Sequence, residues 1–472
     1  KSGAAPSGRA CPGARPCRRR PCGPGSSDGL MVLLIIAPAR PAGGPGTVLV
    51  FWPAMSTPRP AGLPLVLDPA SLRRLSWAFG VTQIVSWGSL FYAIGVLGKS
   101  IRAELGISEP MLFGAVSAAL LINGLGAQAV GRHIDRHGGR RLMATGSLVA
   151  AIAFATIGLA NGPAMYFAGW LVAGIAMPMV FYDPAFATVT RHSGGSYRRA
   201  LTMITLLGGL AGTVFWPLTS TLHDALGWRG TCGVFALLHL LVCMPIHWRM
   251  IPADAPTPAT PPSGGASAAA APGGGSWAGA SPAAKRAFVW LTVAYSFNAF
   301  NMAALLVHLL FLLQARGLSL EQAVLIGTVI GPCQVAVRAS DVIMGGRIKP
   351  FTLGLIATSL VAASVLVLAL SGASMAAGIC FAVLFGMGNG LQTIVRGLVI
   401  GEIFGPSSYG EWLGRMSRYV FVVHALAPFA LSALIGAGLG YANAAWVLVA
   451  VTLSALVAYR VAIPRPARAA GA

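Results

Sequence analysis

Charged side chains are scarce in this sequence. Asp, Glu, Lys and Arg together make up 10% of its 472 residues, and hydrophobic residues make up 56%. Soluble globular domains carry about 25% charged residues, so most side chains of this chain are not expected to face water. The scarcity of charge therefore excludes an ordinary soluble domain.

Patterns that would indicate an enzyme or a metal site are also missing. The seven cysteines show no zinc-site spacing. The chain holds no H-E-x-x-H and no Walker loop, and no G-x-S-x-G in a suitable context. We therefore expect no metal, no cofactor, no enzymatic activity and no ATP-driven pump.

Long apolar runs are what the sequence has in abundance. Runs of about 20 apolar residues span the roughly 30 Å hydrocarbon core of a bilayer. Their backbones must satisfy their own hydrogen bonds there, and runs that are continuous rather than alternating indicate helices. The net charge of +21 then fits basic loops at a membrane better than nucleic-acid binding.

Twelve spans can be placed in two sets of six. The first six are expected near 75–98, 110–131, 142–160, 164–188, 200–222 and 230–248. The second six are expected near 287–313, 321–340, 351–370, 374–399, 412–437 and 443–462. We predict an all-α integral membrane protein made of two six-helix halves, 75–250 and 285–463, which are joined by a Pro-, Gly-, Ala- and Ser-rich flexible linker over 251–284.

The ends of the chain have a different composition. Residues 1–54 are rich in Pro, Gly, Ala and Arg, and Met55 opens a plausible natural start. We interpret 1–54 as upstream sequence translated by mistake. The alternative is a disordered basic tail whose Arg18, Arg19 and Arg20 contact anionic lipid. Segments 55–74 and 464–472 are expected to be cytoplasmic.

The distribution of Lys and Arg predicts the orientation. With twelve spans, most loop Lys and Arg residues fall on one side, and only Lys99, Arg102, Arg229 and Arg316 fall on the other. Cytoplasmic loops carry the excess of positive charge. We therefore expect a multi-pass protein of the cell's cytoplasmic membrane with both termini in the cytoplasm.

A glycine- and arginine-rich motif lies between the second and third predicted spans. Residues 131–142 read GRHIDRHGGRRL. Gly131 permits close helix approach, and Gly138 and Gly139 permit a sharp turn where φ is positive. The stretch resembles the loop signature of the major facilitator superfamily, Gly-x-x-x-Asp-Arg-x-Gly-Arg-Arg/Lys. The matching positions are Gly131, Asp135, Arg136, Gly138 and Arg140, while Gly139 departs from the signature and Arg141 restores a basic pair.

The resemblance implies a fold and a role for this motif. The fold is a twelve-helix transporter covering about residues 70–463. In the family, the aspartate that matches Asp135 pairs with the start of the eleventh span, here 412–437, and the contact breaks as the protein rocks between its two open states. The alternative is a basic loop that only sets topology. A weaker copy of the motif follows the eighth span, at Asp341 and Gly345–Arg347.

Two charged residues within spans are candidates for substrate binding or ion coupling, because charge inside a membrane is costly. Asp183 precedes Pro184, which weakens the helix there. We predict either a proton-coupling or gating site, or an acid paired with Arg191 or with an arginine of the eleventh span. Arg338 follows Gln334 by four residues, and this stretch resembles one in monocarboxylate porters. Those porters have an acid at the position of Gln334, and the arginine that matches Arg338 binds the substrate carboxylate.

Arg338 therefore has two interpretations, an anion anchor or a side chain that snorkels to the membrane surface. Arg396 in the tenth span is a similar candidate. Uncharged polar residues in spans 1, 7 and 10 are further candidates, because in this superfamily these spans surround the central path; each could instead form an interhelical hydrogen bond. They are Gln83, Tyr92, Asn298, Asn301, Asn389 and Gln392.

The sequence thus predicts a secondary active transporter of a small organic solute that works by alternating access. Among such transporters, the sequence favours a proton-linked carrier of organic anions such as monocarboxylates. Multidrug efflux and a non-transporting membrane sensor on the same fold remain alternatives. The expected partners are a small-molecule substrate, protons or another coupling ion, and the lipid bilayer, with the protein acting as a monomer.

Overall fold

Helices account for nearly all of the chain that the structure describes. The structure is a computed structural model, and it describes residues 65–194, 197–253, 277 and 279–463. Within these ranges no β-strand occurs. The predictions for 1–54, for 464–472 and for most of the 251–284 linker lie outside the described residues.

The first half of the described chain contains nine α-helices. Four of them, α1, α2, α8 and α9, continue from or into short π-helical turns at Gly88–Tyr92 and His239–Cys243. The helices are α1 (Pro69–Trp87), α2 (Ile94–Leu105), α3 (Glu109–His137), α4 (Arg140–Gly158), α5 (Pro163–Val180), α6 (Tyr182–His192), α7 (Tyr197–Gly208), α8 (Ala211–Leu238) and α9 (Met244–Met250).

The second half contains longer and less interrupted helices. They are α10 (Pro282–Gln314), α11 (Leu320–Ile343), α12 (Pro350–Leu370), α13 (Met375–Phe404), α14 (Tyr409–Leu434) and α15 (Gly440–Ala462), with a π-helical turn at Ile435–Leu439. Ser281, Ser319 and Ser374 cap α10, α11 and α13 by accepting backbone N–H bonds in the first turn.

The described helices form ten segments that are long and apolar enough to cross a membrane. Two of these segments, Tyr197–Met250 and Tyr409–Ala462, are 54 residues long. A straight helix of that length would measure about 80 Å, far more than a bilayer core. Each segment turns at a glycine outside helical geometry, Gly227 (φ 67°, ψ 176°) and Gly438 (φ 101°). Division at these glycines is compatible with the twelve predicted spans.

The fourth predicted span, 164–188, is broken rather than continuous. Helix α5 ends at Val180 and α6 begins at Tyr182, because Phe181 between them is extended (φ −75°, ψ −166°). Pro184 lies in the first turn of α6, where its missing N–H costs nothing. The predicted weakening around Pro184 is confirmed, and it places Asp183 at the beginning of a new helix.

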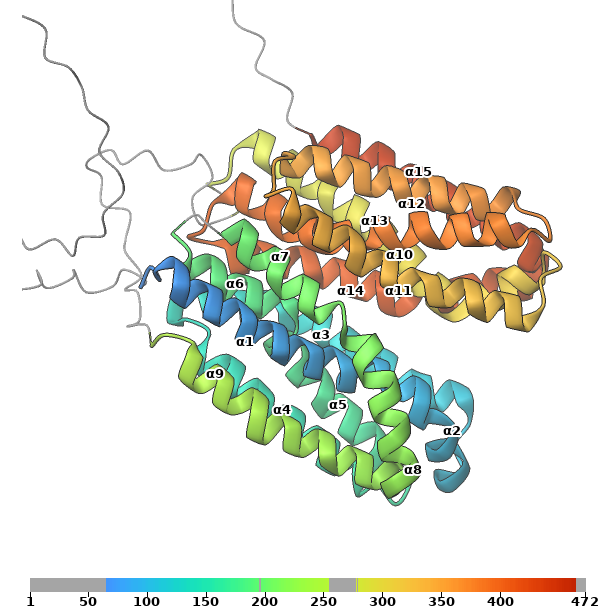
Figure 1. Ribbon diagram of the computed structural model, residues 1–472, viewed down its shortest axis with the longest axis horizontal. Helices are drawn as coiled ribbons and strands as arrows, with labels where there is room; N and C mark the ends of the chain where they lie inside the picture. The colour runs from blue at the N-terminus through green and yellow to red at the C-terminus, as the bar shows by residue number, and fades with distance from the viewer. Residues whose placement is uncertain (1–64, 195–196, 254–276, 278, 464–472) are drawn as a thin grey trace, which may run out of the picture. The chain divides into compact units, whose positions relative to one another are not determined.

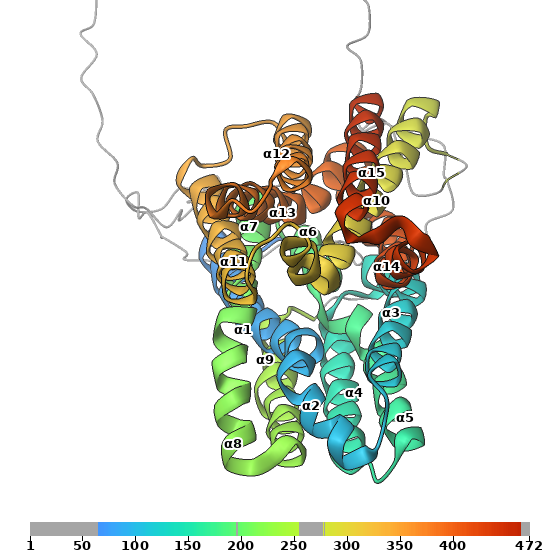
Figure 2. The ribbon, with the colours of Figure 1, turned by 90° about the vertical axis from the view of Figure 1, so that its right-hand side faces the viewer.

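Contacts of helices α14 and α7 connect the two halves. Figures 1 and 2 show α1–α5, α8 and α9 on one side and α10–α15 on the other. Helix α14 packs along α3 and beside α6, and α7 packs against α11 and α13. Small residues let α3 and α14 approach: a Cβ on Gly131 would lie 1.9 Å from the carbonyl oxygen of Gly410.

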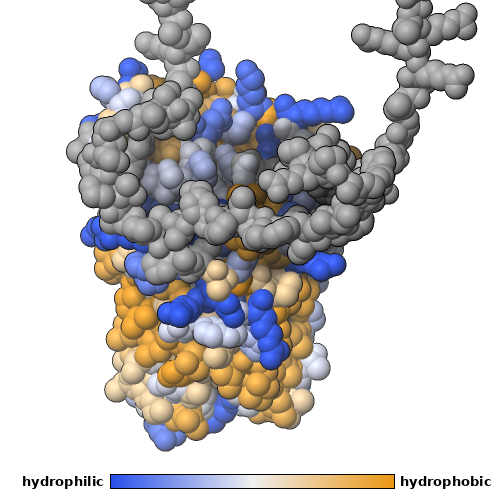
Figure 3. All heavy atoms as spheres, turned by 90° about the vertical axis from the view of Figure 1, so that its left-hand side faces the viewer, coloured by the Kyte–Doolittle hydropathy of each residue, from blue (hydrophilic) through white to orange (hydrophobic). Residues whose placement is uncertain are grey.

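The surface carries many apolar side chains. Large hydrophobic residues such as Ile152, Ile175, Leu241 and Val457 are at least half exposed. Figure 3 shows orange hydrophobic residues reaching the surface over much of the visible lower face. Such a surface suits lipid, where apolar side chains need no cover, and fits an all-α integral membrane protein.

Candidate functional site

The glycine-rich motif forms the turn between α3 and α4, and we call the end of the bundle that holds this turn the motif end. Gly138 has φ 78°, as predicted for a sharp turn. Gly139 was predicted to share this geometry, and that prediction is wrong, because its φ is −88°. Glycine is needed there for packing instead: a Cβ on Gly139 would lie 2.0 Å from Oγ1 of Thr188.

Asp135 caps the first turn of α14. Its Oδ1 accepts a bond from the backbone N–H of Gly410 at 2.9 Å, and its Oδ2 accepts one from Glu411 at 2.7 Å. Arg191 of α6 donates to the backbone carbonyl of Asp135. A carboxylate at a helix N-terminus is stabilised by the unpaired N–H groups and the helix dipole. The contact that the resemblance implied for Asp135 is confirmed.

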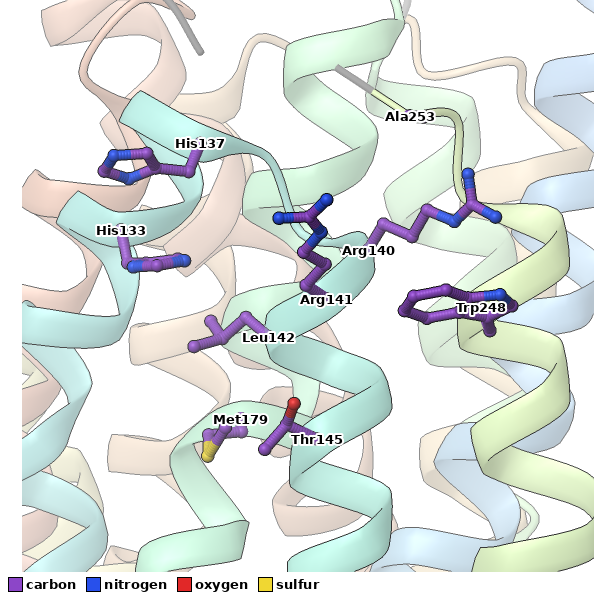
Figure 4. A pocket seen from close by; sticks show the side chains of 9 residues that line it. All are labelled: His133, His137, Arg140, Arg141, Leu142, Thr145, Met179, Trp248 and Ala253. Carbon is purple, nitrogen blue, oxygen red and sulfur yellow. The ribbon is translucent and has the colours of Figure 1, made fainter. Parts of the chain in front are cut away.

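The motif arginines have different surroundings. Arg136 and Arg141 are exposed, whereas Arg140 lies over the ring of Trp248 with 4.9 Å between its guanidinium carbon and the ring centroid. Figure 4 shows Arg140 reaching from the start of α4 towards Trp248, and Arg141 pointing away from it. The basic pair therefore contacts α9 and solvent, while Asp135 and Gly131 contact the second half.

The weaker copy of the motif forms a second link between the halves. Asp341, near the end of α11, accepts a bond from Nη2 of Arg198 at 3.0 Å and one from the hydroxyl of Thr202 at 3.2 Å, both on α7. Gly345 and Gly346 follow with φ values of 63° and 66°. This turn matches the first in its positive-φ glycine and in its carboxylate that reaches the opposite half.

A cavity of about 200 Å³ lies between the two halves. Residues from α1, the following π-helical turn, α6, α7, α10, α11, α13 and α14 line it. They are Trp87, Phe91, Tyr92, Tyr182, Gly208, Gly209, Tyr295, Asn298, Ala299, Met302, Gln334, Arg338, Asn389, Gln392, Thr393, Arg396, Val420, Phe421 and His424. We call this the central cavity.

Arg338 is buried in the wall of the central cavity, with 4% of its surface exposed. It donates to the carbonyls of Gly390 (3.1 Å) and Thr205 (2.9 Å) and to the hydroxyl of Thr393 (3.2 Å). No described carboxylate pairs with it. The interpretation of Arg338 as a residue that snorkels to the surface is therefore wrong, since its charge is held inside the bundle by neutral oxygens.

Arg396, the other arginine of the central cavity, does have an acidic partner. Its Nη2 lies 2.5 Å from Oδ1 of Asp183, and its Nη1 donates to the hydroxyl of Ser417 at 3.0 Å. The paired side chains are 13% and 14% exposed. The predicted partners of Asp183, Arg191 or an arginine of the eleventh span, were wrong: the partner lies on α13, and the pair joins α6 to α13.

The amide candidates divide between the cavity and the packing around it. Asn298 lines the cavity, is 7% exposed, and neither atom of its amide has a partner. Gln392 also lines the cavity; its Nε2 donates to Thr358, while its Oε1 is buried without a partner. Asn301, three residues after Asn298, instead donates to the hydroxyl of Thr452 outside the cavity.

Gln334, Asn389 and Tyr92 line the cavity as predicted candidates, and Asn389 donates to the carbonyl of Phe385 in its own helix. Gln83 was predicted with them, but it is fully buried away from the cavity. Its Nε2 donates to the carbonyls of Val180 and Phe181. It therefore satisfies the carbonyls that the break between α5 and α6 leaves free.

Two glycines at the end of α7 shape the cavity and were not predicted from the sequence: Gly208, the last residue of α7, and Gly209, which follows it. A Cβ on Gly209 would lie 2.2 Å from Nη1 of Arg338, and one on Gly208 would lie 2.4 Å from the hydroxyl of Tyr182. Gly209 therefore makes room for the guanidinium of Arg338, and Gly208 makes room for Tyr182. Adjacent glycines inside an apolar span were the available signal, because glycine marks a close approach.

Comparison with known proteins identifies the class to which this arrangement belongs. The structure resembles those of the human organic anion transporter MFSD10 (TETRAN; TM-score 0.62, 16% identity, 83% of this chain and 100% of the other) and of the transporter FucP in its outward conformation (0.63, 12%, 84% and 100%). It also resembles the proton:xylose symporter XylE (0.62, 11%, 83% and 95%). At these identities the likeness shows the fold alone, which is that of a membrane transporter.

The sequence itself settles the family. The model of the Major Facilitator Superfamily matches residues 79–394. A search of curated protein sequences found no match. The chain belongs to the major facilitator superfamily, whose members are transporters rather than enzymes. The resemblance to monocarboxylate porters in particular is not confirmed by these comparisons.

Proposed function

We propose that this protein is a secondary active transporter of a small organic anion and that Arg338 binds the anionic group. The observation that carries the proposal is the buried, positively charged Arg338 in the wall of the central cavity, held by neutral oxygens without an acidic partner. An uncompensated charge in a dry site is costly, and an anionic solute would offset that cost. A guanidinium also presents two parallel donors to a carboxylate.

The unpaired amides of the cavity refine the proposed substrate. Asn298 offers a donor and an acceptor, and Gln392 offers an acceptor. Leaving such buried groups unpaired costs about 1–3 kcal/mol each, so a bound solute gains by pairing with them. We expect the anion to carry a hydroxyl or a similar polar group besides its carboxylate.

Coupling to protons is the second part of the proposal, and we assign it to Asp183. Protonation of Asp183 would remove the charge that pairs with Arg396 and would weaken the link between α6 and α13. Two neighbours in structure are named as proton symporters, one of xylose and the other, from E. coli, of fucose. One more is named an organic anion transporter. These names support both an organic anion as the substrate and protons as the coupling ion.

We further propose that the motif end faces the cytoplasm and gates the central cavity there. Asp135 of α3 bonds to α14, and Asp341 of α11 bonds to α7, so both carboxylates join the halves at this end. Alternating access would break these contacts when the cavity opens towards the motif end. Both termini would then lie in the cytoplasm, as the excess of Arg in the loops of this end predicts.

Multidrug efflux remains the alternative, and the aromatic lining of the cavity favours it. Trp87 stacks on Phe181 at 4.2 Å between ring centroids, and Phe91, Tyr92 and Phe421 also face the cavity. Aromatic walls suit amphipathic cations. The unpaired positive charge of Arg338 opposes cations, which is why an organic anion is the better candidate.

The proposal is tested with the full chain in liposomes that enclose a pH-sensitive dye. Small monocarboxylates such as lactate are added in one series and cationic drugs in another. A pH change with the carboxylates that disappears in Arg338→Ala is the expected result. A response to cations only would assign the protein to drug efflux. Silence towards both classes would contradict the proposed substrate and would favour another solute or a non-transporting sensor.

A further inference from the structure

A second cavity, of about 540 Å³, lies at the motif end and is separate from the central cavity. It is formed where α3 ends, α4 begins, and α5 and α9 pass beside them. The lining residues are His133, His137, Arg140, Arg141, Leu142, Thr145, Met179, Trp248 and Ala253. Figure 4 shows His133 reaching from α3 towards α4, while the ring of His137 is turned away from α4, and we call this space the motif-end cavity.

Every ionisable side chain that lines the motif-end cavity is basic. His133 and His137 lie one helical turn apart with 4.7 Å between their ring centroids, and Arg140 and Arg141 begin α4 opposite them. No described carboxylate lines the cavity, and the nearby Asp135 is turned towards the N–H groups of α14. Arg140 and Arg141 therefore give the cavity a positive potential.

Two unpaired sets of donors add to this potential. Helix α4 starts at Arg140, and Gly139 before it supplies no side chain to cap the first turn. The N–H groups of an uncapped first turn favour an anion. The Nε of Arg140 is also buried without an acceptor. The exposed side chains of His133, His137 and Arg141 leave these donors open to an anion from outside the bundle.

The other side of the cavity is apolar. Leu142, Thr145 and Met179 lie below Arg141 in Figure 4, and Trp248 closes one side under the guanidinium of Arg140. Thr145 is four residues further along α4 than Arg141, about 6 Å deeper at 1.5 Å per residue. A free phosphate ion would leave this apolar floor without a partner, but the glycerol and upper acyl groups of a phospholipid would cover it.

We propose that the motif-end cavity binds the phosphate group of an anionic phospholipid. The phosphate contacts Arg140, Arg141 and the first turn of α4, and the glycerol backbone rests on Leu142 and Met179. Basic pockets beside transmembrane helices are suited to such headgroups. The site does not depend on the identity of the transported solute.

The test measures lipid binding to the purified full chain by native mass spectrometry. Dioleoyl-phosphatidylglycerol and dioleoyl-phosphatidylcholine are the probes, and inorganic phosphate is added in a separate arm. The variant Arg140→Gln/Arg141→Gln removes two charges from the cavity. Its matched control, Arg73→Gln/Arg74→Gln, removes two charges from exposed positions at the start of α1.

The wild-type chain should bind its first phosphatidylglycerol about tenfold more tightly than phosphatidylcholine, since charge-assisted pairs to phosphate supply at least 1.4 kcal/mol. The cavity variant should lose this preference, and the control should keep it. If Arg140→Gln/Arg141→Gln does not fold, Arg141→Gln alone, at an exposed position, should halve the preference or more. Equal binding of both lipids by the wild type, equal losses in variant and control, or binding of inorganic phosphate without phosphatidylglycerol would overturn the proposal.

Discussion

The motif end and the central cavity differ in whether their charged and polar groups have partners within the protein. At the motif end, the carboxylates of Asp135 and Asp341 each accept two hydrogen bonds from the opposite half. In the central cavity, Arg338 has only neutral acceptors and Asn298 has no partner for its amide. Groups paired within the protein hold a conformation, whereas groups left unpaired in a cavity are available to a solute.

The contrast also separates the two arginines of the central cavity. Arg396 is neutralised by Asp183, so the pair adds no net charge for a solute to meet. Arg338 supplies the net charge. Substitutions at paired groups should therefore change stability or the rate of conformational exchange, and substitutions at unpaired groups should change the affinity for solute.

The largest effect is expected for Asp183→Asn, which leaves Arg396 buried without its counter-charge. Loss of one partner of a buried pair costs about 3–5 kcal/mol, so the Tm in detergent should fall sharply. Arg396→Gln added to Asp183→Asn should restore much of the loss. Glu104→Gln is the matched control, because its pair with Arg229 is 49% and 35% exposed and such pairs contribute about 1 kcal/mol at most. Equal Tm losses in Asp183→Asn and Glu104→Gln would contradict this account of the pair.

Asp135→Asn should slow transport while leaving the amount of protein in the membrane unchanged. The substitution removes the charge that caps α14 and turns one acceptor into a donor facing an N–H group. Loss of a charged hydrogen bond of about 1.5–3 kcal/mol destabilises the state in which the motif end is closed, so the step that re-forms this state should slow at least tenfold, as measured by solute counterflow. Asp224→Asn, at an exposed side chain, serves as the control. Normal uptake by Asp135→Asn would rule out a gating role.

Asn298→Leu should weaken the binding of hydroxylated carboxylates and spare plain ones. The variant keeps the volume of the side chain but removes both unpaired polar atoms, which should raise the KM for a hydroxy acid about fivefold. Asn301→Leu makes the comparison sharp, because it breaks the bond to Thr452 outside the cavity. That variant should lose about 1 kcal/mol of stability with an unchanged KM. A fivefold rise in KM for both kinds of carboxylate would remove the assigned role of Asn298.

The smallest effect is expected from a methyl group added just after the end of α7. A Cβ at residue 209 would lie 2.2 Å from Nη1 of Arg338, whereas one at residue 212 would meet Tyr92 at an ordinary 3.7 Å. Gly209→Ala should displace the guanidinium and raise the KM for anions about threefold, an energy of roughly 0.6 kcal/mol. Gly212→Ala should leave the KM unchanged, and uptake assays of both variants at equal protein amounts check the difference.

The fold could be predicted from the sequence because its determinants are local. Apolar runs of bilayer length define spans, and the motif over 131–142 places Asp135 in the loop where it meets α14. The turn at Gly138 was predictable for the same reason. Gly139 was not, since its requirement comes from Thr188, a residue of another helix.

The central cavity could be predicted only in part, because burial and partners depend on packing between distant helices. Arg338 and Asn298 line the cavity, and their residue types made them candidates, but nothing local distinguished Asn298 from Asn301. Gln83 was predicted as a cavity residue, but it bonds to the carbonyls of Val180 and Phe181, which the helix break leaves free. That break could not be predicted in detail from the sequence. The partner of Asp183 was equally hidden, since Arg396 lies 213 residues away in the chain.

The proposal is tested most directly by asking whether Arg338 makes the protein bind a negatively charged solute more tightly than an uncharged one. Thermal stabilisation of the purified full chain is measured with lactate and with lactamide, its uncharged counterpart. The wild type should be stabilised by lactate and much less by lactamide, and Arg338→Gln should respond weakly and equally to both. Equal stabilisation of the wild type by the two compounds, or a lactate preference that survives in Arg338→Gln, would contradict the assignment of Arg338 as the anion anchor.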